Sequence, residues 1–270
     1  PGERPREGKG SIAAYLAAVR TSSFQLLNLG NLVTLGIVIG LLGASFVLWF
    51  AGAYGLIGLA MIYAYYAAFL LNVAQDAAGG EDELTQPPLE HGLWDGIFFP
   101  ALQFGLTYLV TRVPAWAYLA TMLAQYDAEL IGAAAENPFQ TLLDAGLTKE
   151  LAIYTGLLFA GILLWPMYIL IVAVGGSIFG ISRFDLVMRT ILQTLPAYLV
   201  TVGLVYLAQA LPIAGAAIQH AALQDNSSFM QSAGIHLSQT ALNVVAMVIA
   251  MRAIGLYYHH FKRKFAWSWG

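Results

Sequence analysis

The sequence contains no cysteine. Disulfides, zinc–thiolate sites and iron–sulfur clusters are therefore excluded, and the redox compartment leaves no trace in the composition. Charge is scarce as well, because only 10% of the 270 residues are charged whereas 59% are hydrophobic. A soluble domain carries about 25% charged residues, since its surface has to be hydrated. Twelve basic and fifteen acidic residues cannot cover a soluble globule of this length, so the solvent of this chain is largely lipid.

Sequence motifs that carry chemistry are missing too. A net charge of −3 provides no basic surface for a nucleic acid. The chain has no His-Glu-x-x-His, no nucleophile elbow and no pair of carboxylates within an apolar stretch. The lack of an intramembrane acid lowers the expectation of ion-coupled transport and of hydrolysis within the membrane. We therefore expect a protein that is not an enzyme, binds no cofactor and no nucleic acid, and has the lipid bilayer as its first partner.

A long hydrophobic run is the strongest positive signal. Residues 21–75 contain no Asp, Glu, Lys, Arg or His. As one helix they would extend roughly 80 Å at 1.5 Å per residue, while the hydrocarbon core of a bilayer is about 30 Å thick. The run must therefore fold back, and Gly52-Ala53-Tyr54-Gly55 provides the turn, next to Trp49 and Phe50 at interface height.

Similar apolar stretches recur along the rest of the chain. They predict an all-α, polytopic transmembrane bundle of about six spans, with Pro166 and Pro196 inside the fourth and fifth. The third is the weakest, because Arg112 and Pro114 interrupt it and offer a re-entrant pair as the alternative. The expected spans are 31–50, 55–74, 97–120, 151–174, 190–211 and 236–257, with a short surface helix around 138–146.

Basic residues are distributed asymmetrically between the two sides of this arrangement. With the N-terminus inside, only Lys149 lies in an outer segment, and Arg112 lies within the third span. The positive-inside rule then predicts cytoplasmic N- and C-termini. We expect the membrane to be a bacterial cytoplasmic one. The inner side holds Arg4, Arg6, Lys9, Arg20, Arg183, Arg189, Arg252, Lys262, Arg263 and Lys264.

Both ends of the chain differ from the 31–258 bundle. Residues 1–30 form a cytoplasmic segment in which Ile12, Tyr15, Leu16, Val19, Leu26 and Leu27 share a helical face, which predicts an amphipathic interfacial helix. Residues 259–270 form a basic–aromatic tail. Its predicted membrane anchors are Lys262, Arg263, Lys264, Trp267 and Trp269.

An internal similarity appears at an offset of 90 residues. Residues 108–111 and 198–201 are both Tyr-Leu-Val-Thr, and Leu102-Gln103 matches Leu192-Gln193. The offset suggests a tandem helix-pair repeat over 55–120 and 151–211, as occurs in some transporters. Chance similarity between apolar helices is the alternative.

Small residues form a stripe on the first span. Gly36, Gly40 and Ala44, with Gly43 beside them, recur at helical spacing. Such stripes let two helix backbones approach closely. They predict either packing within the chain or contact with another membrane subunit.

Two arginines lie within predicted spans. Arg112 has no acidic neighbour in an apolar stretch, so it either snorkels to the outer face or binds an anion, a lipid head group or a partner. Arg252 lies close enough to the inner face that we expect it to snorkel there.

The other polar residues near the membrane carry weaker expectations. Hydrogen bonds between helices are the expected role of Asn72, Gln103, Gln193, Gln239 and Asn243, and a polar substrate path is the alternative. His220, Asp225 and His236 share the outer side, but their spacing matches no metal motif, so no metal site is expected.

The arrangement as a whole resembles that of known families. An interfacial helix, a Gly-containing hairpin with an acidic loop, the segment Trp94-Asp95-Gly96 and the close MRAIGLYYHH at 251–260 resemble bacterial multi-pass families of the Yip1-like, domain-of-unknown-function type. The resemblance implies a helical membrane bundle over most of 11–265 and no catalytic residues.

These features favour an accessory or scaffold subunit of a larger membrane complex. The alternative is a channel, transporter or lipid-handling protein whose path lies between the two helix-pair repeats, with Arg112 as its anion or selectivity site. The two hypotheses differ in what they require inside the bundle, because only the second needs a polar cavity.

Overall fold

The computed structural model describes residues 10–48, 51–85, 92–126, 128–176, 178–222 and 229–267. These residues form ten α-helices and no strand, which confirms the all-α class. Five of the helices are long and apolar enough to cross a membrane, so the chain is a multi-pass membrane protein. They are α2 (Leu29–Leu48), α3 (Gly52–Gly79), α7 (Thr148–Gly175), α9 (Leu195–Ala222) and α10 (Phe229–Phe261).

A sixth long helix, α4 (Phe99–Leu123), is not among these five. It follows a π-helical turn, η3 (Trp94–Phe98), and continues without a break through Arg112 and Pro114. Proline is tolerated within membrane helices because neighbouring groups satisfy the backbone that it frees. The prediction of about six spans is roughly consistent with the five apolar helices, and a sixth span in α4 remains a prediction.

The chain folds as two compact units. The larger unit comprises residues 1–104 and 167–270, and the smaller unit comprises residues 105–166. Helices α4 and α7 each belong partly to the larger unit and partly to the smaller one.

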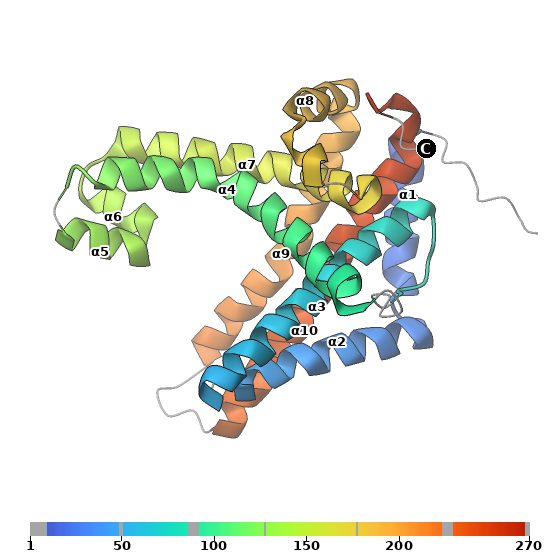
Figure 1. Ribbon diagram of the computed structural model, residues 1–270, viewed down its shortest axis with the longest axis horizontal. Coiled ribbons are helices and arrows are strands. Elements are labelled where there is room, and N and C mark those ends of the chain that lie inside the picture. The colour runs from blue at the N-terminus through green and yellow to red at the C-terminus, as the bar shows by residue number, and fades with distance from the viewer. Residues whose placement is uncertain are drawn as a thin grey trace, which may run out of the picture. The chain divides into compact units, whose positions relative to one another are not determined.

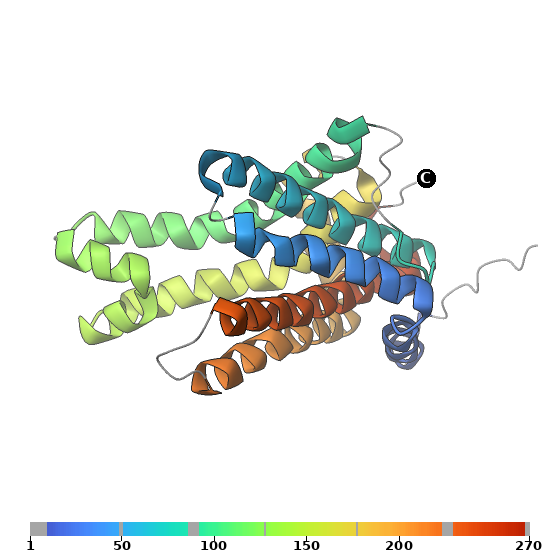
Figure 2. The same cartoon turned by 90° about the horizontal axis from the view of Figure 1, so that it is seen from below.

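Helix α10 is the centre of the larger unit. It packs against α9, α3, α2 and α1 (Ile12–Gln25), and Figures 1 and 2 show α2, α3, α9 and α10 running side by side. The helix is apolar and buried on more than one side, since Val244, Ala246, Val248, Ala250 and Ala253 are all completely buried. Small side chains allow the backbones of membrane helices to approach closely.

A close backbone approach in this unit lies between α10 and α3. A Cβ atom added to Gly255 would overlap the carbonyl oxygen of Ala74 and lie 2.8 Å from the backbone nitrogen of Ala78. Only glycine therefore allows this crossing, and α3 is buried along the same stretch, from Ala68 to Ala78.

The N-terminal helix α1 is held against α10. Its buried residues are Tyr15, Val19 and Ser22, which lie on one helical face. The Tyr15 hydroxyl donates to the carbonyl oxygen of Ala253 at 3.1 Å and accepts from Thr201 at 3.0 Å. Burial raises the pKa of Tyr15 above its ordinary value. Leu16 and Leu27, expected on the same face, are exposed instead.

The fifth predicted span begins later than expected. Residues 184–193 form a separate helix, α8 (Phe184–Gln193), after a short 3₁₀ turn, η4 (Ile178–Ser182), and the backbone breaks at Thr194 before α9 begins. Pro196 explains the break, because it has no N–H to donate to a preceding turn yet fits the first turn of a new helix. The predicted boundary at residue 190 is therefore wrong.

The proposed repeat remains a prediction, although two of its helices share features. Both α3 and α7 contain 28 residues, and each is followed by a glycine with positive φ, Gly80 at 88° and Gly176 at 62°. The matched tyrosines differ, since Tyr108 is 44% exposed and Tyr198 is 2% exposed.

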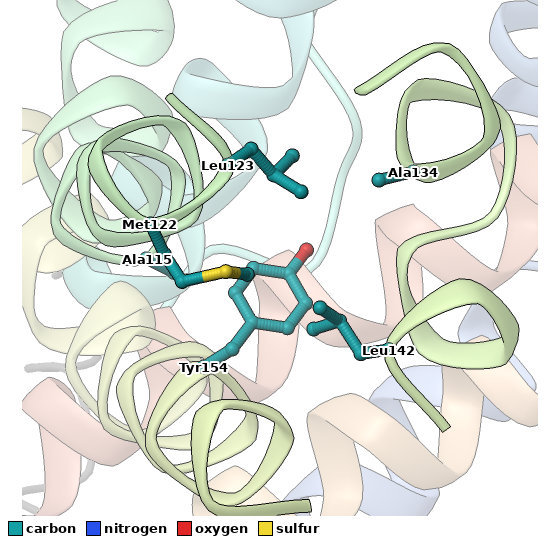
Figure 3. Packing of buried hydrophobic residues seen from close by; sticks show 6 residues of the cluster. All are labelled: Ala115, Met122, Leu123, Ala134, Leu142 and Tyr154. Carbon is teal, nitrogen blue, oxygen red and sulfur yellow. The ribbon is translucent and has the colours of Figure 1, made fainter. Parts of the chain in front are cut away.

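The smaller unit is a helical hairpin with its own core. Parts of α4 and α7 pack with α5 (Ala128–Glu136) and α6 (Pro138–Asp144), the latter close to the predicted surface helix. Asn137 caps α6 by accepting a hydrogen bond from the Gln140 amide at 3.2 Å. Figure 3 shows the core of this unit, in which the Tyr154 ring lies between Met122 and Leu142, with Ala115, Leu123 and Ala134 around them.

Candidate functional site: a polar cavity among four helices

A cavity of about 390 Å³ opens among α2, α3, α9 and α10 of the larger unit. This volume is at the lower end of the range for small-molecule sites. Its lining is mixed, with apolar walls and an unusual number of polar side chains for a bundle of membrane helices. The lining residues are Leu42, Ser45, Tyr63, Tyr66, Gln209, His236, Gln239, Thr240, Asn243, Val244 and Met247.

Helical periodicity brings these side chains to one place. On α10, positions 236, 239, 240, 243 and 247 are spaced by three or four residues, which puts them on one helical face. Helix α2 contributes Leu42 and Ser45 and helix α3 contributes Tyr63 and Tyr66, each pair also three residues apart. Three stripes, together with Gln209 from α9, therefore converge on the same space.

The cavity has a buried floor and an open side. Ser45 is 2% exposed and Val244 is completely buried, whereas Tyr63 is 52% exposed. A molecule in the cavity would thus be enclosed at one end by Ser45 and Val244 and would reach the surface of the larger unit beside Tyr63.

Some of the polar side chains are fixed by partners within the chain. The Gln239 amide nitrogen donates to the carbonyl oxygen of Pro212 at 2.7 Å. The Gln209 amide nitrogen lies 2.9 Å from the sulfur of Met247. The His236 ring lies 5.3 Å from the Phe46 ring, centroid to centroid. These contacts hold the side chains in place around the cavity.

Three buried polar atoms on the cavity wall have no hydrogen-bond partner within the described protein. They are the Tyr66 hydroxyl, Nε2 of His236 and Oε1 of Gln239. Leaving a buried polar group unsatisfied costs about 1–3 kcal/mol. Three such atoms on one wall are therefore an unusual feature that a bound molecule with matching groups would relieve.

The sequence identified only part of this site. Gln239 and Asn243, for which a polar path was the alternative, lie together here, whereas Asn72, Gln103 and Gln193 are not among the lining residues. His236, considered only for a metal site that was not expected, lines the cavity as well. Gln103 instead donates to the carbonyl oxygen of Gly176 at 3.1 Å, as expected for a bond between helices. Ser45, Tyr63, Tyr66 and Gln209 were missed, and only their spacing on apolar helices gave a signal.

Arg112 takes no part in the cavity. It belongs to the smaller unit, where its guanidinium lies 5.5 Å from the centre of the Tyr108 ring, one helical turn earlier on α4. Among the described residues it forms no ion pair. The face of an aromatic ring attracts a cation and partly replaces its lost hydration. The anion, lipid or partner role of Arg112 remains a prediction.

Arg252 does not snorkel to the interface, so that expectation is wrong. Its side chain is 3% exposed and donates to the Ser22 hydroxyl and to the carbonyl oxygens of Asp82, at 2.9 Å, and Glu81, at 3.1 Å. An ion pair with the Asp82 carboxylate, at 3.5 Å, adds to this. Burying a guanidinium is tolerable only where such partners replace water.

The loop that receives Arg252 is tied to α2 as well. The Leu84 amide donates to Oδ1 of Asn31 at 2.8 Å, and the Asn31 amide nitrogen donates to the carbonyl oxygen of Gln25 at 2.8 Å. These contacts form a polar, hydrogen-bonded cluster, which we call the Arg252 clasp. It consists of Ser22, Asn31, Glu81, Asp82 and Arg252. It fastens α1 and the loop after α3 to α10.

The small-residue stripe of α2 divides into two parts. A Cβ atom on Gly43 would lie 2.8 Å from Cδ1 of Leu237, so Gly43 serves packing within the chain. Cβ atoms on Gly36 and Gly40 would meet nothing within 4 Å, and Ala44 is exposed. The outer stripe, Gly36, Gly40 and Ala44, is therefore not used by the chain's own described packing.

The C-terminal tail begins with the exposed turn η5 (Lys262–Lys264). Beyond it the chain folds back, since the Ala266 amide donates to the Thr190 hydroxyl at 3.2 Å and Phe265 contacts the rings of Tyr257 and Trp267, both at 5.3 Å. Trp269 lies outside the described residues. The anchoring role of Lys262, Arg263, Lys264, Trp267 and Trp269 remains a prediction.

The side chains of His220 and Asp225 also lie outside the described part of the chain, and within that part no three of the His, Asp and Glu residues gather as metal ligands would.

The resemblance to Yip1-like families stays a prediction. Comparison with protein-family models, with curated proteins and with solved structures found no match for this chain.

Proposed function

We propose that this chain is a multi-pass membrane protein, not an enzyme, that takes a small molecule into the polar cavity of its larger unit. It would then act as a transporter, channel or lipid-handling protein. The observation that carries the proposal is the group of three unpartnered buried polar atoms, on Tyr66, His236 and Gln239. A bundle that only had to be stable would gain by replacing such groups with apolar ones.

The cavity differs in place from the path that the sequence suggested. Helices α2 and α10, which lie outside the two proposed repeats, supply most of its wall, and Arg112 is absent from it. The proposal therefore keeps the function class of that path and moves its site. We also propose, from the distribution of basic residues, that both termini are cytoplasmic. The resemblance to bacterial multi-pass families supports the further proposal that the membrane is a bacterial cytoplasmic one.

The lack of native cysteine makes the cavity directly testable. We expect Ser45→Cys, a near-isosteric change at the cavity floor, to react with methyl methanethiosulfonate in membranes. Val248→Cys is the matched control, because Val248 is fully buried on α10 and does not line the cavity. The Ser45→Cys thiol should react about tenfold faster or more, because a reagent in the cavity reaches it, whereas the Val248→Cys thiol borders no cavity and reacts only after local opening. Equal rates would refute an accessible cavity.

The outward stripe of α2 favours a second candidate function, an accessory or scaffold subunit. Gly36, Gly40 and Ala44 leave a groove open to another transmembrane helix. Of the four residues predicted for partner contact, Gly43 packs against Leu237 of the same chain. The other three are exposed and available to a partner helix.

Replacing Gly40 with leucine tests this second candidate. If a partner helix packs there, Gly40→Leu removes a co-purifying membrane protein from the mild-detergent extract, because the side chain fills the groove. Gly203→Leu is the control, since Gly203 is also exposed, with nothing within 4 Å, but lies on α9. A complex that survives Gly40→Leu, or that both variants lose, contradicts the partner role of the stripe.

A further inference from the structure

The charge of the cavity wall restricts what it can hold. None of the described lining residues is Asp, Glu, Lys or Arg. Arg252, on the same helix α10, is engaged by Asp82, Glu81 and Ser22. A charged molecule among membrane helices is costly unless an opposite charge is present. The wall therefore favours an uncharged occupant.

The Gln239 amide determines one group that the occupant must have. Its nitrogen is held by the carbonyl oxygen of Pro212 at 2.7 Å, which fixes the orientation of the amide and leaves Oε1 as the free atom. An amide oxygen only accepts hydrogen bonds. The occupant must therefore carry an O–H or N–H donor.

The other two unpartnered atoms favour a group that both donates and accepts, as a hydroxyl does. A tyrosine hydroxyl both donates and accepts, and a ring nitrogen of neutral histidine does one or the other. The His236 ring is held beside Phe46, so Nε2 has a fixed place. A hydroxyl on the occupant can donate to Gln239 and accept from Tyr66 or His236 at once, whereas an ether or ketone cannot donate.

The remaining wall is apolar. Leu42 and Val244 are buried at the floor, and Met247 adds a flexible thioether that adapts to irregular shapes. A purely polar occupant would leave these surfaces without apolar contacts. An occupant with an apolar part fits both halves of the wall.

We infer that the cavity binds an uncharged amphiphile that bears a hydroxyl group, with Tyr66, His236 and Gln239 recognising the hydroxyl. This inference rests on the proposed function and adds the chemical class of the ligand. Such chemistry occurs in neutral lipids such as diacylglycerol and in water-soluble polyols such as glycerol. The two sources differ in the side from which the ligand enters.

Thiol reagents of different charge test the first half of the inference. The rates at Ser45→Cys are measured with uncharged, cationic and anionic methanethiosulfonates, each divided by the rate at the exposed control Lys149→Cys. We expect the uncharged reagent to lead both charged ones by about tenfold. Equal normalised rates overturn the uncharged class and leave the accessible cavity intact. If no reagent reacts, the proposed function fails, and this inference fails with it.

Protection of the same thiol tests the second half. With Ser45→Cys in phosphatidylcholine nanodiscs, we expect diacylglycerol in the bilayer or glycerol in the buffer to slow labelling by the uncharged reagent several-fold. Slowing by diacylglycerol identifies a lipid source, and slowing by glycerol identifies a soluble one. The acetylated diacylglycerol, which has no donor, should not protect. Protection by the acetylated compound, or by none of the three, overturns the inference.

Discussion

Gly255→Ala is expected to destabilise the larger unit by about 3 kcal/mol, at the upper end of overpacking effects. The added methyl would overlap the Ala74 carbonyl oxygen and approach the Ala77 side chain and the Ala78 nitrogen. Two of these three atoms belong to the backbone of α3, which cannot rotate away as a flexible side chain can. Helix α10 would have to move from α3 as a whole.

The measurement is unfolding in mild detergent, followed by the loss of helical circular dichroism with temperature or denaturant. Gly234→Ala is the matched control, because Gly234 lies on the same helix with nothing within 4 Å. The control should change stability by about 1 kcal/mol or less, and in the stabilising direction, since alanine favours helix more than glycine does. If both variants unfold alike, the crossing of α10 and α3 is not as tight as described.

Arg252→Met has the second large expected effect, a loss of about 3 kcal/mol, because it removes several hydrogen bonds of a buried guanidinium, each worth about 1.5–3 kcal/mol. Methionine fills a similar volume but offers no hydrogen-bond donor to the Ser22 hydroxyl or to the carbonyl oxygens of Glu81 and Asp82. The Asp82 side chain is 60% exposed, so water hydrates its carboxylate in the variant. The loss of folding stability is therefore not larger. Arg252→Lys should rescue only in part, because an ammonium lacks the guanidinium fork.

A second ion pair provides the contrast for this prediction. Arg183 and Asp185 are 3.2 Å apart, but their side chains are 58% and 68% exposed. Hydrogen bonding to Arg183 lowers the pKa of Asp185, and solvent screens this exposed pair. Arg183→Met should therefore have the same unfolding stability as the native chain. Protease should cut the link between α1 and α2 faster in Arg252→Met but not in Arg183→Met. Similar behaviour of the two variants would show that the Arg252 clasp does not fasten α1.

The existence of the membrane helices followed from composition alone, whereas their boundaries depended on local detail. Residues 21–75 had to fold back because one helix of that length exceeds the bilayer, and α2 and α3 do so. The break at Thr194 was not predicted, because the predicted fifth span, 190–211, contained Pro196 without an interruption. Proline is compatible with either a kink or a helix start, and only packing decides between them.

Residues that meet across long separations in the chain could not be predicted from it. Arg252 reaches Ser22 and the Glu81–Asp82 loop, 230 and about 170 residues away, so its position near a helix end suggested snorkelling instead. The cavity has the same origin. The stripe 236, 239, 243 and 247 is visible on α10, but Tyr66 joins it only once the facing helices are known.

The most direct test of the ligand site compares Ser45→Cys with Val248→Cys in native membranes, after each variant is shown to retain the native helical content. A reagent-accessible cavity predicts that the Ser45→Cys thiol reacts about tenfold faster or more, since its side chain lines the cavity and Val248 does not. Equal and slow reaction of both thiols would contradict an accessible cavity among α2, α3, α9 and α10.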